Sequence, residues 1–332
     1  MDEILFEATS REEGNGMGTA APAAVALLAA EPIGPDLGAY GAAKWRGGVL
    51  GANGLIYFVP CCANRILRVD PATEAAEPVG PDLGAHGNEY KWDGGVLGAN
   101  GHIYFLPCCA KRILRFDPAT NAAEPVGPDL GAYGDYKWSG GVLGADGHIY
   151  FVPWCAERIL RFDPATNAAE PVGPDLGAYG DFYKWSGGVL GADGHIYFVP
   201  GSANRILRFD PASNAAEPVG PDLSAYGDAK WSGGVLGADG HIYFVPCDAH
   251  RILRFDPATT HAERLAIGPD RGAYGDGKWS GCVLGANGHI YFVPMNAKRI
   301  LQLTSRSSGS SRLSDTCVIL VSGFVHSFKD YN

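Results

Sequence analysis

A nearly identical segment recurs along the chain, and this repeat is the feature that most constrains the fold. One copy runs from Lys137 to Gly173 and reads KWSGGVLGADGHIYFVPWCAERILRFDPATNAAEPVG. The tryptophan that opens each copy, called the marker tryptophan below, occurs at a spacing of 46–48 residues, at Trp45, Trp92, Trp138, Trp185, Trp231 and Trp279. Six copies at this period are typical of repeat architectures, in which each copy is one supersecondary unit.

Each copy reads as four short β-strands. The first, KWSGGVLGA, ends at an Asn-Gly or Asp-Gly pair such as Asp146-Gly147, which predicts a tight two-residue hairpin turn. HIYFVP and RILRFD follow, rich in β-branched and aromatic residues, and Asp-Pro-Ala-Thr favours a turn after the third strand. The fourth strand, AAEPVG, contains a proline and therefore belongs at a sheet edge. Four antiparallel strands in about 40–50 residues are typical of one β-propeller blade.

The two ends of the repeat region indicate how the ring closes. The sixth copy stops after its third strand at Leu303, and the missing fourth strand is found as Ala29–Gly34, before the first marker tryptophan. We therefore expect an all-β fold, a six-bladed β-propeller of four-stranded antiparallel blades, with the last blade closed by an N-terminal strand. The expected divisions are a polar N-terminal lead (1–23), the propeller (24–303), and a Ser-rich linker with a short apolar C-terminal tail (304–332).

The composition of the chain limits the kinds of partner and the cellular location that we expect. The net charge of −10 argues against nucleic acid or an anionic membrane as the main partner. Met1–Gly18 is polar and acidic, unlike a secretory signal, and the apolar run Ala20–Ala30 is too short to cross a bilayer. The cysteine spacing follows the repeat and not a disulfide framework. We expect an intracellular, cytoplasmic monomer with reduced thiols.

The blade sequence resembles two propeller families. Gly140-Gly141, Ile149-Tyr150 and Asp163–Thr166 resemble a kelch blade, although a kelch blade carries its double glycine after the Ile-Tyr strand, where this chain has Val-Pro. The run GHIYFVP…RILRFDPATN is similar to lyase-type and NHL-type propellers. Both resemblances imply a propeller. Neither implies an activity, because unrelated functions occur on this fold and no residue here matches a catalytic His or metal carboxylate of those families.

Differences between the copies concentrate in two loops, which strand order places on one face of the propeller. The first joins the second and third strands and contains Cys61-Cys62, Cys108-Cys109, Trp154-Cys155, Gly201-Ser202, Cys247-Asp248 and Met295-Asn296. The second precedes the lysine and marker tryptophan and contains Ala42-Ala43, Asn88–Tyr90, Asp135-Tyr136, Asp181–Tyr183, Asp228-Ala229 and Asp276-Gly277. Variable loops on a rigid scaffold commonly carry binding function. We therefore predict the site on this face, called the loop face below.

The main interpretation is a non-catalytic binding or scaffold module that recognises a protein or a small anionic ligand. The predicted ligand-binding anchors on the loop face are Tyr90, Trp154, Tyr183 and Met295, with Tyr136 beside them. The lysine before each marker tryptophan is expected around the rim of the pore, as a cationic collar of Lys44, Lys91, Lys137, Lys184, Lys230 and Lys278. Alternatively, the nearby aspartates Asp135, Asp181, Asp228 and Asp276 neutralise this collar.

Two alternatives remain open. In one, the loop cysteines, with Asp248 and His250, hold a soft metal such as zinc or copper(I). In the other, the protein is a propeller enzyme of lyase or lactone-hydrolase type with a metal in the central channel. Its candidate acids, bases and ligands are His86, Glu89, Glu157, Asp248 and His250. The favoured interpretation has no cofactor and no metal.

Overall fold

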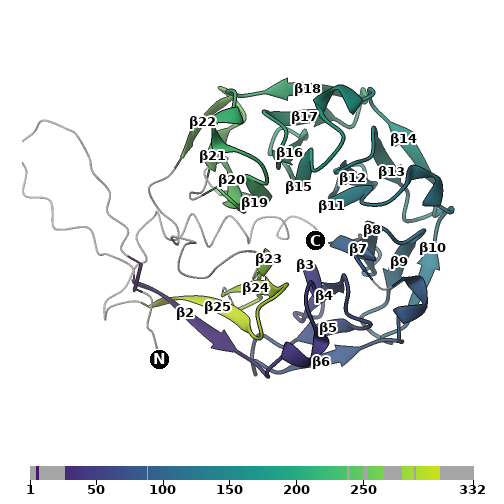
Figure 1. Ribbon diagram of the computed structural model, residues 1–332, viewed down its shortest axis with the longest axis vertical. Helices are drawn as coiled ribbons and strands as arrows, with labels where there is room; N and C mark the ends of the chain where they lie inside the picture. The colour runs from purple at the N-terminus through teal and green to yellow at the C-terminus, as the bar shows by residue number, and fades with distance from the viewer. Residues whose placement is uncertain are drawn as a thin grey trace, which may run out of the picture.

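Six antiparallel sheets form a ring around a central channel, as the repeat predicts (Figure 1). The computed structural model describes residues 5–6, 27–87, 89–237, 240–249, 253–264, 279–287 and 289–306. The strands nearest the channel each begin at a marker tryptophan, and are β3 (Trp45–Leu50), β7 (Trp92–Leu97), β11 (Trp138–Leu143), β15 (Trp185–Leu190), β19 (Trp231–Leu236) and β23 (Trp279–Leu284). The fold class predicted from the sequence is confirmed.

The remaining strands follow outward in each blade. The second strands are β4 (Ile56–Pro60), β8 (Ile103–Pro107), β12 (Ile149–Pro153), β16 (Ile196–Pro200), β20 (Ile242–Pro246) and β24 (Ile290–Pro294). The third strands are β5 (Ile66–Val69), β9 (Ile113–Phe116), β13 (Ile159–Phe162), β17 (Ile206–Asp210), β21 (Leu253–Asp256) and β25 (Ile300–Arg306). The outer strands of the first five blades are β6 (Ala76–Val79), β10 (Ala123–Val126), β14 (Ala169–Val172), β18 (Ala215–Val219) and β22 (His261–Arg264).

The outer strand of the last blade comes from the N-terminal part of the chain. Strand β2 (Leu27–Ile33) pairs antiparallel with β25 from Leu27↔Arg306 to Ile33↔Ile300, so the two lie side by side in Figure 1 although they are far apart in sequence. The short strand β1 (Leu5–Phe6) pairs in turn with β2. The predicted closure is therefore confirmed, and the ring has no unpaired seam at this blade.

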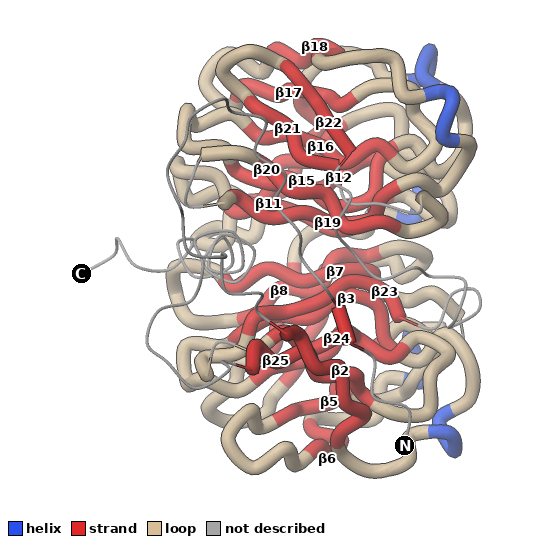
Figure 2. The backbone as a smooth tube through the Cα atoms, turned by 90° about the vertical axis from the view of Figure 1, so that its left-hand side faces the viewer, coloured by secondary structure: helices blue, strands red, loops and turns tan. Residues whose placement is uncertain are grey.

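Short 3₁₀ turns occur in the described connections that return from an outer strand to the channel. They are η1 (Gly38–Tyr40), η2 (Gly84–His86), η3 (Gly131–Tyr133), η4 (Gly177–Tyr179) and η5 (Ser224–Tyr226). Figure 2 shows these turns along one side of the ring, which is the loop face. Within the described ranges, none of the helices has the length and apolar character needed to cross a membrane.

The hairpin turn between the first and second strands differs from the two-residue turn predicted from Asn-Gly. The N–H of Gly54 donates to Gly51 O at 3.0 Å, and the N–H of Gly51 donates to Leu55 O at 2.8 Å. This pattern is a three-residue hairpin loop, in which a type I turn is followed by a glycine in the left-handed region, with φ 79° at Gly54. Only the glycine of the pair needs a positive φ, because the turn is one residue longer than expected.

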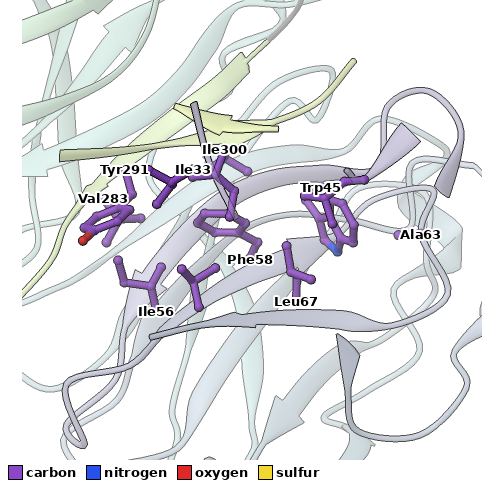
Figure 3. Packing of buried hydrophobic residues seen from close by; sticks show 12 residues of the cluster. Ile33, Trp45, Ile56, Phe58, Ala63, Leu67, Val283, Tyr291 and Ile300 are labelled. Atoms are coloured by element: carbon purple, nitrogen blue, oxygen red, sulfur yellow. The ribbon is translucent and has the colours of Figure 1, made fainter. Parts of the chain in front are cut away.

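The core consists of clusters between neighbouring blades. In Figure 3, Trp45, Phe58 and Leu67 of the first blade pack in one buried cluster with Ile33 and Ile300 of the last. The indole N–H of Trp45 donates to Arg65 O at 3.0 Å, and the marker tryptophans of the next three blades make the same bond.

The double glycines of neighbouring blades pack on one another. In five of the six blades the first glycine faces its counterpart in the next blade, and a Cβ added to Gly94 would lie 2.6 Å from the Cα of Gly140.

The arginines of the third strands form ion pairs across to the outer strands. Arg115 of β9 pairs with Glu124, which lies directly opposite on β10, and the equivalent pair occurs in four other blades. Asp117 has a different role, because it accepts hydrogen bonds from Ala119 N at 2.9 Å and Thr120 Oγ1 at 2.7 Å. The aspartate therefore stabilises the turn after the third strand.

Candidate functional site

The two variable loops meet on the loop face, as predicted, and backbone hydrogen bonds connect them around the channel mouth. Cys61 N donates to Lys44 O of its own blade at 3.0 Å, and Lys91 N of the next blade donates to Cys61 O at 3.1 Å. The same alternation continues through Cys108, Trp154 and Gly201. The loop that follows the second strand is thus fixed between two lysine residues of adjacent blades.

The side chains of those lysines do not form the exposed collar expected from the sequence. Lys44, Lys91, Lys137, Lys184 and Lys230 are buried. Their ammonium groups donate to loop carbonyls, such as Gly41 O at 3.1 Å and Met295 O at 3.2 Å for Lys44, and Cys62 O at 3.2 Å for Lys91. Burial lowers the pKa of each of the five. Their placement indicates a structural role, and Lys278 lies outside the described residues.

Aromatic residues from three consecutive blades gather on one side of the channel mouth. This aromatic cluster consists of Tyr90, Tyr136, Trp154, Phe182 and Tyr183. Trp154 is its centre, with ring centroids 5.7 Å from Tyr136, 5.8 Å from Phe182 and 5.1 Å from Tyr183.

The members of the cluster differ in exposure. Trp154, expected as an exposed anchor, is only 5% exposed, whereas Phe182 is 59% exposed. Tyr90 and Tyr183 are half-buried, as is Met295, whose backbone carbonyl binds Lys44. The structure brings the anchor candidates Tyr90, Trp154 and Tyr183 into one cluster. Phe182 is the exposed member, and it was not among the residues predicted from the sequence.

Three tyrosines of this cluster have an unusual backbone conformation. Tyr90, Tyr136 and Tyr183 have φ of 48°, 52° and 58°, in the left-handed region that bulky residues rarely adopt. Such positions cost on the order of 1–3 kcal/mol each and persist when surrounding structure imposes them. Here the carbonyl of each tyrosine accepts a loop N–H, including Cys109 N to Tyr90 O at 2.9 Å. These hydrogen bonds from the neighbouring loop therefore hold each tyrosine in its strained conformation.

The residue after each marker tryptophan faces the channel and was missed by the sequence reasoning. The pairing of β11 with β12 shifts from Trp138↔Pro153 to Gly141↔Phe151, so Ser139 falls in a bulge. The equivalent residues line the channel as an inner ring of Arg46, Asp93, Ser139, Ser186, Ser232 and Ser280. The available signal was that one position carries Ser in four copies and Arg and Asp in the two others.

Hydrogen bonds connect the inner ring from blade to blade. Arg46 Nη1 lies 3.1 Å from Asp93 Oδ2, and Ser139 Oγ donates to the same carboxylate oxygen at 3.0 Å. Ser139 and Ser186 are 3.1 Å apart, and Arg46 Nε reaches Ser280 Oγ at 3.4 Å. Burial raises the pKa of Asp93, while Arg46 and the Ser139 hydroxyl oppose the rise. The channel also contains a cavity of about 150 Å³ lined by the double glycines and these serines.

Arg46 joins the inner ring to the aromatic cluster. Its guanidinium carbon lies 4.9 Å from the ring centroid of Trp154 and 5.9 Å from that of Tyr90, within the range of cation–π contacts. The indole nitrogen of Trp154 is buried and has no hydrogen-bond partner among the residues that the structure describes. A buried N–H without an acceptor is costly, which marks this atom as an available donor.

The residues proposed for metal binding or catalysis do not assemble into a site in the part of the chain that the structure describes. Among the residues that the structure describes, there is no group of three or more His, Cys, Asp and Glu side chains able to hold a metal ion. His86 packs edge-on against Trp92 with centroids 5.4 Å apart, and Glu89, Glu157 and Asp248 are exposed. His250 lies outside the described residues.

Comparison with known proteins supports the fold and leaves the activity open. No family model and no curated protein matches the chain. Solved structures do, including virginiamycin B lyase from Staphylococcus aureus (21% identity, TM-score 0.57, covering 79% of this chain and 80% of the other). A gluconolactonase from Xanthomonas campestris matches at 15% identity and TM-score 0.56, covering 85% and 90% of the two chains.

A third similar structure is an auxiliary nutrient binding protein from Bacteroides ovatus (13% identity, TM-score 0.58, covering 84% of this chain and 77% of the other). Fold and neighbours thus define the chain as a six-bladed β-propeller, a fold that it shares with the lyase and the gluconolactonase, and the neighbours reported give no specific support for kelch. Since two of these three proteins are named as enzymes and one as a binding protein, the fold alone does not select a function.

Proposed function

We propose that this chain is a ligand-binding propeller whose aromatic cluster holds a small organic ligand at the channel mouth. The observation that carries the proposal is Trp154, which lies buried at the centre of the cluster with an indole N–H that has no partner within the described ranges. A ligand that supplies a hydrogen-bond acceptor there would satisfy the N–H, and the surrounding rings would contact its apolar part.

Exposure supports the loop face as the ligand-binding side. In the described part of the chain, the large apolar side chains that remain exposed are Tyr40, Tyr133, Tyr179 and Phe182. All four belong to the connections that lead to a marker tryptophan, on the loop face. Of these, Phe182 contacts Trp154 and Tyr136, so the cluster combines an exposed ring with a buried donor.

The chemistry of the cluster favours a flat, apolar ligand with an acceptor group. The anionic ligand expected from the lysine collar has less support, because the five described lysines are buried and bonded to carbonyl oxygens. Arg46 is likewise engaged by Asp93 and by the faces of Trp154 and Tyr90. A protein partner for the whole loop face remains a prediction.

Ligand-observed NMR with a library of aromatic fragments tests the proposal. Fragments that bind the wild-type chain are measured again with Phe182→Ala, which removes the exposed ring of the cluster. Tyr179→Ala is the matched control, because Tyr179 is also exposed on the loop face but its ring contacts Trp185 and lies outside the aromatic cluster. We expect about tenfold weaker binding for Phe182→Ala and little change for the control. Equal affinities in all three proteins, or no fragment that binds, would contradict the proposal.

The enzymatic alternative has no comparable support from residues. Its candidate side chains do not form a cluster in the described ranges, and Asp93, a carboxylate of the inner ring, is bonded to Arg46 and Ser139. The names of the similar lyase and gluconolactonase structures favour catalysis only by analogy of fold.

A further inference from the structure

The first glycines of the double-glycine pairs form a ring around the channel, and this ring is open at one place. In five blades, a Cβ added to the first glycine would lie 2.6–3.5 Å from the Cα of its counterpart in the next blade. A Cβ added to Gly233 of the fifth blade would have no described atom within 4 Å. The fifth and sixth blades, which are neighbours in the ring (Figure 1), are therefore separated where Gly233 and Gly281 would otherwise meet.

Apolar side chains of the fifth blade are less buried at this seam than their equivalents elsewhere. Val235 of β19 is half-buried, whereas the equivalent valines of the other blades are only 6–8% exposed. Val245 of β20 is also half-buried, whereas its equivalents are fully buried. Both valines line the channel cavity of about 150 Å³. The part of this cavity that is lined by Val235, Val245, Cys282, Ser232 and Ser280 is called the seam pocket below.

Cys282 of β23 accounts for the separation of the two blades. It stands where the other five copies have the second glycine of the pair. That glycine lies close to the preceding blade, and a Cβ added to Gly95 would lie 2.8 Å from Cγ2 of Val49. The same distance is 2.6–3.1 Å in three other blades. Val235 is the corresponding valine for Cys282, so the thiol side chain needs space that a glycine does not and holds the seam open.

The hydrogen bonds of the inner ring are interrupted at the same seam. They run without a break from Arg46 to Ser186, and Ser186 Oγ lies 3.0 Å from Ser232 Oγ. On the other side of the seam, Arg46 Nε donates to Ser280 Oγ at 3.4 Å. Ser232 and Ser280 are adjacent in the ring, but within the described ranges no hydrogen bond joins them. The seam pocket is therefore bordered by two hydroxyls that the chain does not connect.

The ion pair of the inner ring fixes the direction of the serine hydroxyls. An ionised carboxylate only accepts hydrogen bonds, so the single hydroxyl hydrogen of Ser139 is donated to Asp93. Ser186 must then donate to Ser139, and Ser232 must donate to Ser186. At the seam, Ser232 therefore offers only the acceptor lone pairs of its oxygen.

Ser280 has the opposite character. Its oxygen accepts from Arg46, because a guanidinium only donates, and its own hydroxyl hydrogen remains available. A group that fits between the two serines must donate to Ser232 and accept from Ser280. A hydroxyl does both, whereas a carboxylate or an ether only accepts and an ammonium only donates.

We propose that the seam pocket binds a small, uncharged alcohol, whose hydroxyl bridges Ser232 and Ser280. Its carbon skeleton packs against Val235, Val245 and Cys282. A cavity of about 150 Å³ accommodates a skeleton of about the size of benzene. Burial raises the pKa of Cys282 to about 12, so at neutral pH the thiol is uncharged and suits an apolar skeleton. The inference does not depend on ligand binding by the aromatic cluster.

Methyl NMR with cyclohexanol tests the inference. Cyclohexanol is not aromatic, so its binding is a separate question from that of the aromatic cluster. In the full chain with ¹³C-labelled valine methyls, the signals of Val235 and Val245, assigned with Val235→Ala and Val245→Ala, should shift and saturate. The signals of Val142 and Val189, which are buried between other blades, should stay in place. Methoxycyclohexane accepts a hydrogen bond but cannot donate one to Ser232, and it should bind about tenfold more weakly.

Matched substitutions isolate the feature that opens the pocket. Cys282→Gly copies the other five blades, lets the sixth blade approach Val235 and should abolish binding of cyclohexanol. Cys282→Ala keeps the Cβ and should bind like wild type. The unshifted signals of Val142 and Val189 show that each variant is folded. The inference would be overturned by the absence of a saturable shift at Val235 and Val245, by equal affinities for cyclohexanol and methoxycyclohexane, or by equal binding in Cys282→Gly and Cys282→Ala.

Discussion

The guanidinium of Arg46 lies 3.1 Å from the carboxylate of Asp93, across the boundary between the first and second blades. Both side chains are nearly buried, at 9% and 7% exposure. Four other blades carry serine at the same position of the inner ring. The pair therefore breaks the symmetry of the channel at the side where Arg46 contacts Trp154.

Removing one partner of this pair should destabilise the propeller far more than removing both. Asp93→Ser leaves Arg46 buried without its carboxylate, which we expect to cost about 3–5 kcal/mol. The double variant Arg46→Ser/Asp93→Ser copies the other blades and should recover most of that loss. Urea unfolding of the three proteins measures the effect. A double variant as unstable as the single one would show that the ion pair itself is required.

The closing strand should be essential to the fold. A chain lacking residues 1–36 loses β2, which pairs with β25 and contributes Ile33 to the core. We expect it to aggregate or to lose its cooperative thermal transition. A chain lacking residues 1–23 keeps β2 and serves as the control. If the longer deletion melts like the control, closure by β2 does not stabilise the ring.

Replacing alanine by glycine should have opposite effects on stability at two positions, one with a strained backbone just before a lysine of the loop face and one without strain. Ala229 has φ 48°, so Ala229→Gly relieves strain and should raise stability by about 0.5–1 kcal/mol. Ala85 is an exposed residue of η2 without a positive φ, and Ala85→Gly should lower stability. Melting temperatures decide between the two, and a loss of stability in both variants would contradict the strain at Ala229.

The turn aspartates predict a loss of stability in acid. Hydrogen bonds from Thr166 Oγ1 and Ala165 N lower the pKa of Asp163 below its usual value of 3.8. The same kind of turn lowers the pKa of four other aspartates, Asp70, Asp117, Asp210 and Asp256. Because the folded-state pKa is depressed, this stabilisation is present above about pH 4 and is lost as pH falls through the folded-state value. The melting-temperature difference between wild type and Asp163→Asn should therefore shrink from pH 6 to pH 2. A constant difference would contradict the assignment.

The fold could be predicted because the repeat itself indicates where each blade begins and how the ring closes. Six marker tryptophans define the blades, and the missing fourth strand after Leu303 indicates closure by the N-terminal part. Local backbone detail was less accessible, since Asn-Gly also fits the three-residue loop that Gly54 closes.

The site was predictable only in part, because side-chain placement depends on packing between blades. Lys44 and Lys91 looked like a rim but bind the carbonyls of neighbouring loops. Trp154 looked like an exposed anchor but packs on Arg46, a residue two blades away in sequence. The lysines, which are the same in every copy, have a structural role. The candidate site is formed by positions at which single copies differ from the others.

The indole N–H resonance of Trp154 tests the central claim most directly. In ¹⁵N-labelled protein it is assigned with Trp154→Phe, and the N–H signals of Trp45, Trp92, Trp138 and Trp185, which are bonded to carbonyls, serve as internal references. A saturating fragment that binds the aromatic cluster should shift the Trp154 signal downfield, because the N–H gains an acceptor, and should leave the references in place. A bound fragment that leaves the Trp154 signal unchanged would contradict the account.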